Sequence, residues 1–151
     1  MNRTAAEPSF SHRAIVRFQD CDPAGVVFFA RVFEFFHDAY AAFLTKAGLP
    51  LSRLLDEKVF MTPIVHAEAD YHSPLRCGDE IQTTLCAITL GRSSMTIRYQ
   101  IEKLSPKAPA PERCATGTTV HVFVDGTSFA KIPIPPDARA ALEPHIDAEA
   151  N

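Results

Sequence analysis

Two aspartates frame a short turn near the amino terminus of this 151-residue chain. Residues 20–25 read Asp-Cys-Asp-Pro-Ala-Gly, here called the acidic turn, and lead into the most apolar helix-like stretch of the sequence. Pro23 favours an extended backbone at Asp22, and Gly25 permits a turn that a side chain would obstruct. The first turn of a helix has unpaired N–H groups and a partial positive charge, which can stabilise an oxyanion. A carboxylate beside such a helix start predicts acyl-transfer chemistry.

Asp22 is the candidate for this chemistry, either as the nucleophile or as the base that activates water. Its alternative role is to cap the turn or the following helix. Asp20 could be a capping residue, a hydrogen-bond partner of the loop, or a second charge that perturbs the Asp22 carboxyl. We favour a structural role. Cys21 is a poor candidate nucleophile because the two flanking carboxylates disfavour its thiolate.

The acidic turn resembles that of the 4-hydroxybenzoyl-CoA thioesterase family of hotdog-fold enzymes. Residues 62–65 (Thr-Pro-Ile-Val) and 74–79 fit the same family, and the resemblance covers roughly residues 13–124. Residues 17–30 and 63–67 look most like the 1,4-dihydroxy-2-naphthoyl-CoA thioesterases of that family. Cys21 and Pro23 match the hydroxybenzoyl branch instead, so the acyl group stays open.

The resemblance implies roles for three positions of the acidic turn and the segment after it. Asp22 would be catalytic, and the backbone N–H of Phe29 would bind the thioester carbonyl. Gly25 would let the acyl group approach the loop, although its simplest role is a turn residue with positive φ. No cofactor is implied.

Two histidines are candidates for contact with the substrate. His66 follows residues 63–65 in the pattern of the naphthoyl-CoA relatives, and its alternative role is that of a hydrogen-bonded interface residue. His37, on the apolar helix, could reach a ring hydroxyl or could be a satisfied core histidine. Neither belongs to a ligand cluster that predicts a metal site.

Coenzyme A carries phosphates, and Arg92 with Ser93 and Ser94 is the best candidate to bind one. Guanidinium groups match phosphate geometry. The alternative is an ordinary exposed arginine in a turn. Other cations could serve instead: Arg98, Lys103 or Lys107.

Composition narrows the class of protein. A formal net charge of −3 without basic runs argues against nucleic acid and anionic membranes as partners. The four cysteines form no zinc-type or C-x-x-C pair, and no signal peptide is visible, so we expect reduced thiols and a cytoplasmic location. Charged residues interrupt the apolar stretch 26–44, which indicates a core helix and not a membrane span.

The length predicts one domain, residues 1–151, with a core of about residues 10–132. Residues 31–47 predict a helix that is apolar around most of its circumference, should be almost surrounded by protein, and ends at Gly48. A first strand is expected over residues 10–18, and near-alternation predicts four more at 64–72, 80–90, 93–103 and 114–125. Pattern alone gives α+β, and the resemblance implies the hotdog fold, an antiparallel sheet of about five strands wrapped around one long helix. Such a sheet leaves an edge exposed, so a homodimer or a homotetramer built from two dimers is expected.

The sequence thus predicts an acyl-CoA thioesterase that converts an aromatic or compact acyl-CoA to the carboxylic acid and CoA. One alternative is a hotdog dehydratase or hydratase of 3-hydroxyacyl thioesters, in which Glu34 or His37 would outweigh Asp22. Another is a module that binds acyl-CoA without catalysis.

Overall fold

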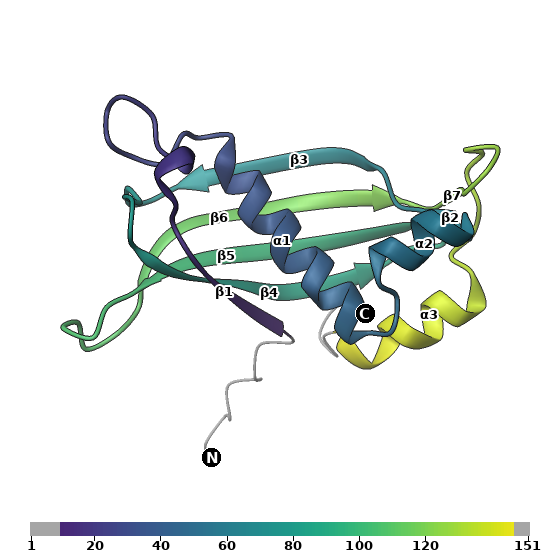
Figure 1. The fold of residues 1–151 in the computed structure, drawn as a ribbon. Coiled ribbons are helices and arrows are strands. Elements are labelled where there is room, and N and C mark those ends of the chain that lie inside the picture. Colours follow the sequence, from purple (N-terminus) through teal and green to yellow (C-terminus); the bar gives the residue numbers. More distant parts are fainter. Residues whose placement is uncertain (1–9, 147–151) are drawn as a thin grey trace, which may run out of the picture.

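Alternating apolar residues build five strands into one antiparallel sheet (Figure 1). The computed structural model describes residues 10–146. In sheet order the strands are β1 (Phe10–Ile15), β4 (Glu80–Leu90), β5 (Ser94–Leu104), β6 (Glu112–Val122) and β3 (Ile64–Tyr71). The helix α1 (Arg31–Lys46) lies across one face of this sheet. This arrangement confirms the predicted α+β hotdog fold.

The helix α1 forms because apolar side chains recur every three or four residues along residues 31–46. Its buried residues are Val32, Phe35, Phe36, Ala39, Tyr40, Phe43 and Leu44. The helix ends where Gly48 adopts a φ of +83° and donates from its N–H to the Thr45 carbonyl, as predicted. The expectation that protein surrounds this helix is wrong within one chain, in which His37 and Asp38 are exposed.

The helix α1 and the sheet approach each other closely at Gly117 of β6. The Phe36 ring stacks on Tyr99 of β5, with centroids 4.6 Å apart and an interplanar angle of 14°. A Cβ atom at Gly117 of β6 would overlap both the Phe36 ring and the Glu68 carbonyl oxygen. Gly117 is therefore required by the close approach of α1 to the sheet.

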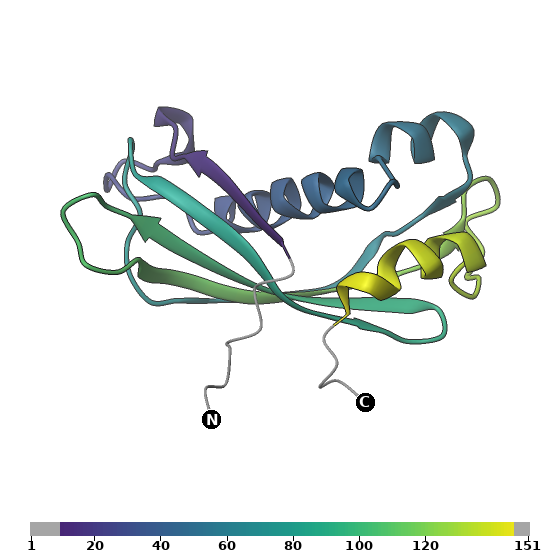
Figure 2. The same cartoon turned by 90° about the horizontal axis from the view of Figure 1, so that it is seen from below.

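Smaller elements complete the end of the molecule away from the acidic turn (Figures 1 and 2). The strands β2 (Phe60–Met61) and β7 (Val124–Asp125) pair separately from the main sheet. Two short helices, α2 (Leu51–Glu57) and α3 (Pro136–Leu142), and a 3-10 turn at Glu143–His145 follow, whereas the other 3-10 turn, Phe18–Asp20, leads into the acidic turn. Ala138 and Leu142 of α3 are buried, so the core extends beyond residue 132.

The strand β3 is an edge of the sheet. It pairs only with β6, and Ile64, Val65 and Tyr71 are 47%, 60% and 50% exposed. Unpaired backbone groups beside apolar side chains are a template for pairing with another strand. Among residues 10–146, no helix is long and apolar enough to cross a membrane.

Candidate active site

The acidic turn is the tip of a short hairpin. Asp22 donates from its N–H to the Val26 carbonyl at 2.9 Å, and Phe28 donates to the Asp20 carbonyl at 2.9 Å. Gly25, with a φ of +80°, donates to the Asp22 carbonyl at 2.9 Å, which closes the turn. The positive φ agrees with the turn role expected for this glycine. The helix α1 begins only at Arg31, with Ala30 as its N-cap, so Asp22 is not a helix cap.

The Asp22 carboxylate is half-buried and held by one oxygen. Its Oδ1 accepts a hydrogen bond from the Ala24 N–H at 2.9 Å. No group among residues 10–146 donates to Oδ2. This bond fixes the carboxylate while one oxygen stays available for a substrate or a water molecule.

Asp20 has the opposite surroundings. It is 1% exposed, and its carboxylate accepts from the Arg17 N–H at 2.8 Å and from the Arg17 guanidinium at 2.9 and 3.2 Å. Burial alone raises the pKa of the Asp20 carboxyl, but the hydrogen bonds and charge of Arg17 outweigh burial and lower that pKa overall. Asp20 is therefore ionised at neutral pH, and both of its carboxylate oxygens accept hydrogen bonds from Arg17.

The backbone N–H of Phe29 lies between the hairpin and α1. Nothing among residues 10–146 accepts a hydrogen bond from it. The neighbouring backbone groups are occupied: Arg31 donates to the Phe28 carbonyl at 2.8 Å, and the Tyr71 hydroxyl donates to the Phe29 carbonyl at 2.7 Å. An unpaired, oriented N–H at the start of a helix is suited to bind an oxyanion.

Residues 74–79 lie against the hairpin and hold it through hydrogen bonds. Val27 donates to the Leu75 carbonyl at 2.8 Å, and Arg76 Nη1 donates to the Gly25 carbonyl at 3.4 Å. The Arg76 N–H in turn donates to the Asp79 carboxylate at 2.8 Å. The support given by Arg76 to the turn was missed from the sequence, since a separation of 51 residues gives no local signal.

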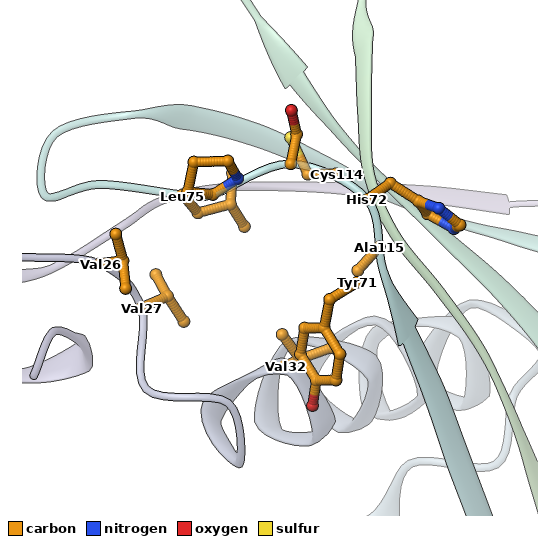
Figure 3. A pocket seen from close by; sticks show the side chains of 10 residues that line it. Val26, Val27, Val32, Tyr71, His72, Leu75, Cys114 and Ala115 are labelled. Atoms are coloured by element: carbon orange, nitrogen blue, oxygen red, sulfur yellow. The ribbon is translucent and has the colours of Figure 1, made fainter.

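A largely apolar cavity of about 320 Å³ adjoins this hairpin (Figure 3). Figure 3 shows Val26 and Val27 on one side of it and Tyr71 on the other, with the Tyr71 hydroxyl pointing toward the start of α1. Its other lining residues are Val32, His72, Ser73, Pro74, Leu75, Cys114 and Ala115. A compact apolar group could bind beside the acidic turn.

The two candidate histidines lie apart from the acidic turn. His37 is exposed on α1, and its ring meets the Tyr40 ring edge-on at 5.8 Å between centroids. His66 is exposed on β3, where Nε2 lies 3.3 Å from a Glu68 carboxylate oxygen. The next residue, Ala67, lines a cavity with His37 under α1, so His66 points to the opposite face of the sheet. Within one chain, His66 is not brought to Asp22.

Arg92, Ser93 and Ser94 lie in the turn between β4 and β5, which the Gly91 N–H closes by donating to the Ser94 carbonyl at 2.8 Å. Together with Lys131 and Pro133 they line a cavity of about 470 Å³, here called the cationic pocket. Lys131 was missed from the sequence because an isolated lysine after β7 carries no motif. Two cations and two hydroxyl groups can bind a phosphate.

The cationic pocket and the acidic turn lie at opposite ends of the sheet. Ser94 begins β5 in the pocket, whereas Ile101 pairs with Ala115, which lines the cavity beside the acidic turn. Since β5 advances about 3.3 Å per residue, Ser94 and Ile101 are roughly 23 Å apart along the strand. The strand β3 connects the same two ends, because Ile64 pairs with His121 and Tyr71 pairs with Ala115.

Residues 10–146 contain no group of three or more histidine, cysteine, aspartate or glutamate side chains arranged to hold a metal ion.

Comparison with known proteins gives consistent results. The thioesterase-like superfamily matches residues 16–142. A 1,4-dihydroxy-2-naphthoyl-CoA hydrolase of Synechococcus elongatus is 33% identical over 127 residues, covering 83% of this chain and 89% of its own length. The corresponding hydrolase of Gloeothece citriformis is 37% identical over 120 residues, with coverages of 80% and 82%.

Solved structures agree with these relatives. A 1,4-dihydroxy-2-naphthoyl-CoA thioesterase from Synechocystis superimposes with a TM-score of 0.78 at 29% identity, covering 88% of this chain and 94% of its own. A gentisyl-coenzyme A thioesterase gives a TM-score of 0.76 at 30% identity, with coverages of 87% and 98%.

Proposed function

Because the chain belongs to the thioesterase-like superfamily and is an acyl-CoA thioesterase, we propose that it hydrolyses a hydroxylated aromatic acyl-CoA at the acidic turn. The preferred substrate is 1,4-dihydroxy-2-naphthoyl-CoA or a close analogue, since relatives with 33% and 37% identity are named for that ester. The products are the aromatic carboxylic acid and free CoA. No cofactor takes part.

One observation carries the site assignment. The acidic turn and the segment after it supply two groups without a partner among residues 10–146: a carboxylate oxygen of Asp22 without a donor and the N–H of Phe29 without an acceptor. Attack on a thioester needs these two groups: one supplies or activates the nucleophile, and the other stabilises the negative charge on the carbonyl oxygen. Asp20 is unsuited to the first role because Arg17 occupies it.

The proposed reaction proceeds through a tetrahedral intermediate. Asp22 accepts a proton from water as the water oxygen attacks the thioester carbon, or its carboxylate attacks that carbon directly to form an anhydride. The carbonyl π electrons move to oxygen, where the Phe29 N–H stabilises them. The C–S bond then breaks with its electron pair on sulfur, and the thiolate takes up a proton. In the direct route, water subsequently hydrolyses the anhydride.

We infer that a second copy of the chain completes the site. A CoA ester bound at Asp22 needs a phosphate contact, yet the cationic pocket of the same chain lies at the far end of the sheet. Two β3 edges that pair antiparallel about a two-fold axis bring the Ile64 end of one beside the Tyr71 end of the other. The partner's cationic pocket would then approach Asp22. We therefore propose a homodimer with two shared sites, which can pair further into a homotetramer, and a cytoplasmic setting.

A thiol-release screen tests the function. We expect hydrolysis of hydroxylated aromatic CoA esters, with 1,4-dihydroxy-2-naphthoyl-CoA preferred over benzoyl-, phenylacetyl- and short aliphatic CoA. A crotonyl thioester should be neither hydrated nor cleaved efficiently. Hydration of that ester without thiol release would instead indicate a hydratase. Measurable affinity for the panel with no thiol release would indicate a binding module.

A further inference from the structure

The Tyr71 hydroxyl is the one side-chain group among residues 10–146 that bonds to the backbone of Phe29. Tyr71 ends the edge strand β3, while Phe29 precedes α1, and 42 residues separate them in sequence. The hydroxyl donates to the Phe29 carbonyl at 2.7 Å, a typical distance for a well-formed O–H···O bond. The bond thus connects the end of the sheet to the residue whose N–H is assigned to the oxyanion.

The helix itself restrains the Phe29 carbonyl only weakly. Its other donor is the Val32 N–H, at 3.4 Å, well beyond the usual 2.9 to 3.0 Å for an N–H···O bond. Because hydrogen bonds weaken as they lengthen, the Tyr71 bond is the stronger restraint on this carbonyl. The Tyr71 hydroxyl keeps its proton and remains a donor at neutral pH, because the ordinary pKa of a tyrosine is about 10 and partial burial raises it further.

The Phe29 N–H is consequently fixed from two sides. Its own peptide group includes the Phe28 carbonyl, which accepts from the Arg31 N–H at 2.8 Å. On the other side of the Phe29 Cα atom, the carbonyl is held by Tyr71. A peptide N–H can stabilise an oxyanion only if it points at the oxygen before the reaction begins.

We propose that Tyr71 is a positioning residue of the thioesterase reaction, and that its hydroxyl aims the Phe29 N–H at the oxyanion of the tetrahedral intermediate. This role rests on the proposed function. Tyr71 does not touch the reacting atoms. It acts through the Phe29 backbone, so its removal weakens transition-state stabilisation and leaves ground-state binding nearly unchanged.

Tyr71→Phe deletes the hydroxyl and keeps the ring. We expect kcat for an aromatic CoA ester to fall about tenfold, less than the 10²-fold or more typical for complete loss of an oxyanion donor, with KM within about twofold. The matched control is Tyr99→Phe, which removes a buried hydroxyl 3.1 Å from that of Thr119. The control should lower the melting temperature and leave kcat within about twofold.

A double-mutant cycle separates positioning from a general structural effect. Phe29→Pro removes the N–H itself, so adding Tyr71→Phe should cause little further loss of kcat. Full additivity would overturn the proposed role, as would an unchanged kcat in Tyr71→Phe or a rise in KM alone. No hydrolysis of any CoA ester by the unsubstituted protein would overturn the function itself. An active enzyme unaffected by Tyr71→Phe would overturn only the role of Tyr71.

Discussion

Arg17 encloses the Asp20 carboxylate with three hydrogen bonds of 2.8 to 3.2 Å, while Asp22, two residues later, keeps one oxygen without a donor. Two carboxylates in one turn thus have different surroundings. Asp20 fixes the hairpin through Arg17, and Asp22 is the carboxylate proposed for the chemistry. The following predictions depend on this division.

Asp20→Asn should damage stability more than catalysis. The substitution removes a buried charge paired with Arg17, and we expect a loss on the order of 2 kcal/mol in the free energy of unfolding. Where the variant is folded, kcat should stay within about tenfold of the unsubstituted value. Urea titration and steady-state kinetics at the same temperature measure both. A kcat lowered a thousandfold in a fully folded variant would assign the chemistry to the wrong aspartate.

Stability should decrease in mild acid because of His121. This histidine is 1% exposed, Nε2 lies 2.9 Å from the Thr119 hydroxyl, and Nδ1 lies 3.1 Å from the Thr62 carbonyl. Burial lowers its pKa from 6.5 to about 4. The ionisable groups beside it are Tyr40 and His37 of α1 and Tyr99 of β5.

At pH values between these two pKa values, His121 binds a proton in the unfolded chain but stays neutral in the folded protein. The contribution of His121 to the free energy of unfolding is therefore complete above pH 6.5. It is lost as the pH falls toward 4, by up to roughly 3 kcal/mol. Urea midpoints measured from pH 7.5 to 4 should show this slope. His121→Gln should be less stable at pH 7.5 and show a flatter dependence. Equal slopes for the two proteins would exclude His121 as the cause.

The Phe29 N–H can be tested apart from the Phe29 side chain. Phe29→Ala keeps the N–H, whereas Phe29→Pro removes it. If this N–H stabilises the oxyanion, kcat should fall by on the order of 10²-fold in the proline variant relative to the alanine variant, with the fold verified by circular dichroism. Similar kcat values for the two folded variants would place the oxyanion elsewhere.

A shared site predicts complementation between two protomers that are impaired in different ways. Arg92→Ala combined with Lys131→Ala should raise KM for CoA esters roughly tenfold, leave kcat nearly unchanged, and have no effect on a pantetheine ester that lacks the nucleotide phosphates. Mixing and reannealing this variant with Asp22→Asn should produce heterodimers with one intact site. At low substrate, activity should exceed the sum of the two parents. Strictly additive activity, with exchange verified, would contradict a site built from two protomers.

Periodicity predicted the scaffold of this site well. Residues 31–47 and the four later strand segments differ from α1, β3, β4, β5 and β6 by only a few residues at their ends. The two-residue strands β2 and β7 were not predicted, since two residues carry no period. His37 was expected on a nearly surrounded helix, but apolar content does not reveal which side of a helix the sheet leaves uncovered.

The sequence predicted the chemistry of the acidic turn only in part. The sequence and its family resemblance singled out Asp22, Gly25 and Phe29, whereas the bonds that distinguish Asp22 from Asp20 depend on the Arg17 conformation. Tyr71 and Lys131 were missed as members of the site for another reason. Tyr71 bonds to Phe29 across 42 residues of sequence, and Lys131 lines the same pocket as Arg92 from a separate segment, and a single sequence carries no local signal of such contacts.

The most direct test of the account is Asp22→Asn, which keeps the side-chain size and removes the charge. We predict a folded protein whose kcat is lower by on the order of 10³-fold, about 4 kcal/mol of barrier, with a much smaller change in KM. A single turnover of the unsubstituted enzyme in ¹⁸O-water distinguishes the two routes, because direct attack by Asp22 leaves the first product unlabelled. A kcat near that of the unsubstituted enzyme in Asp22→Asn, with deamidation to aspartate excluded by mass spectrometry, would contradict the assignment of the active site.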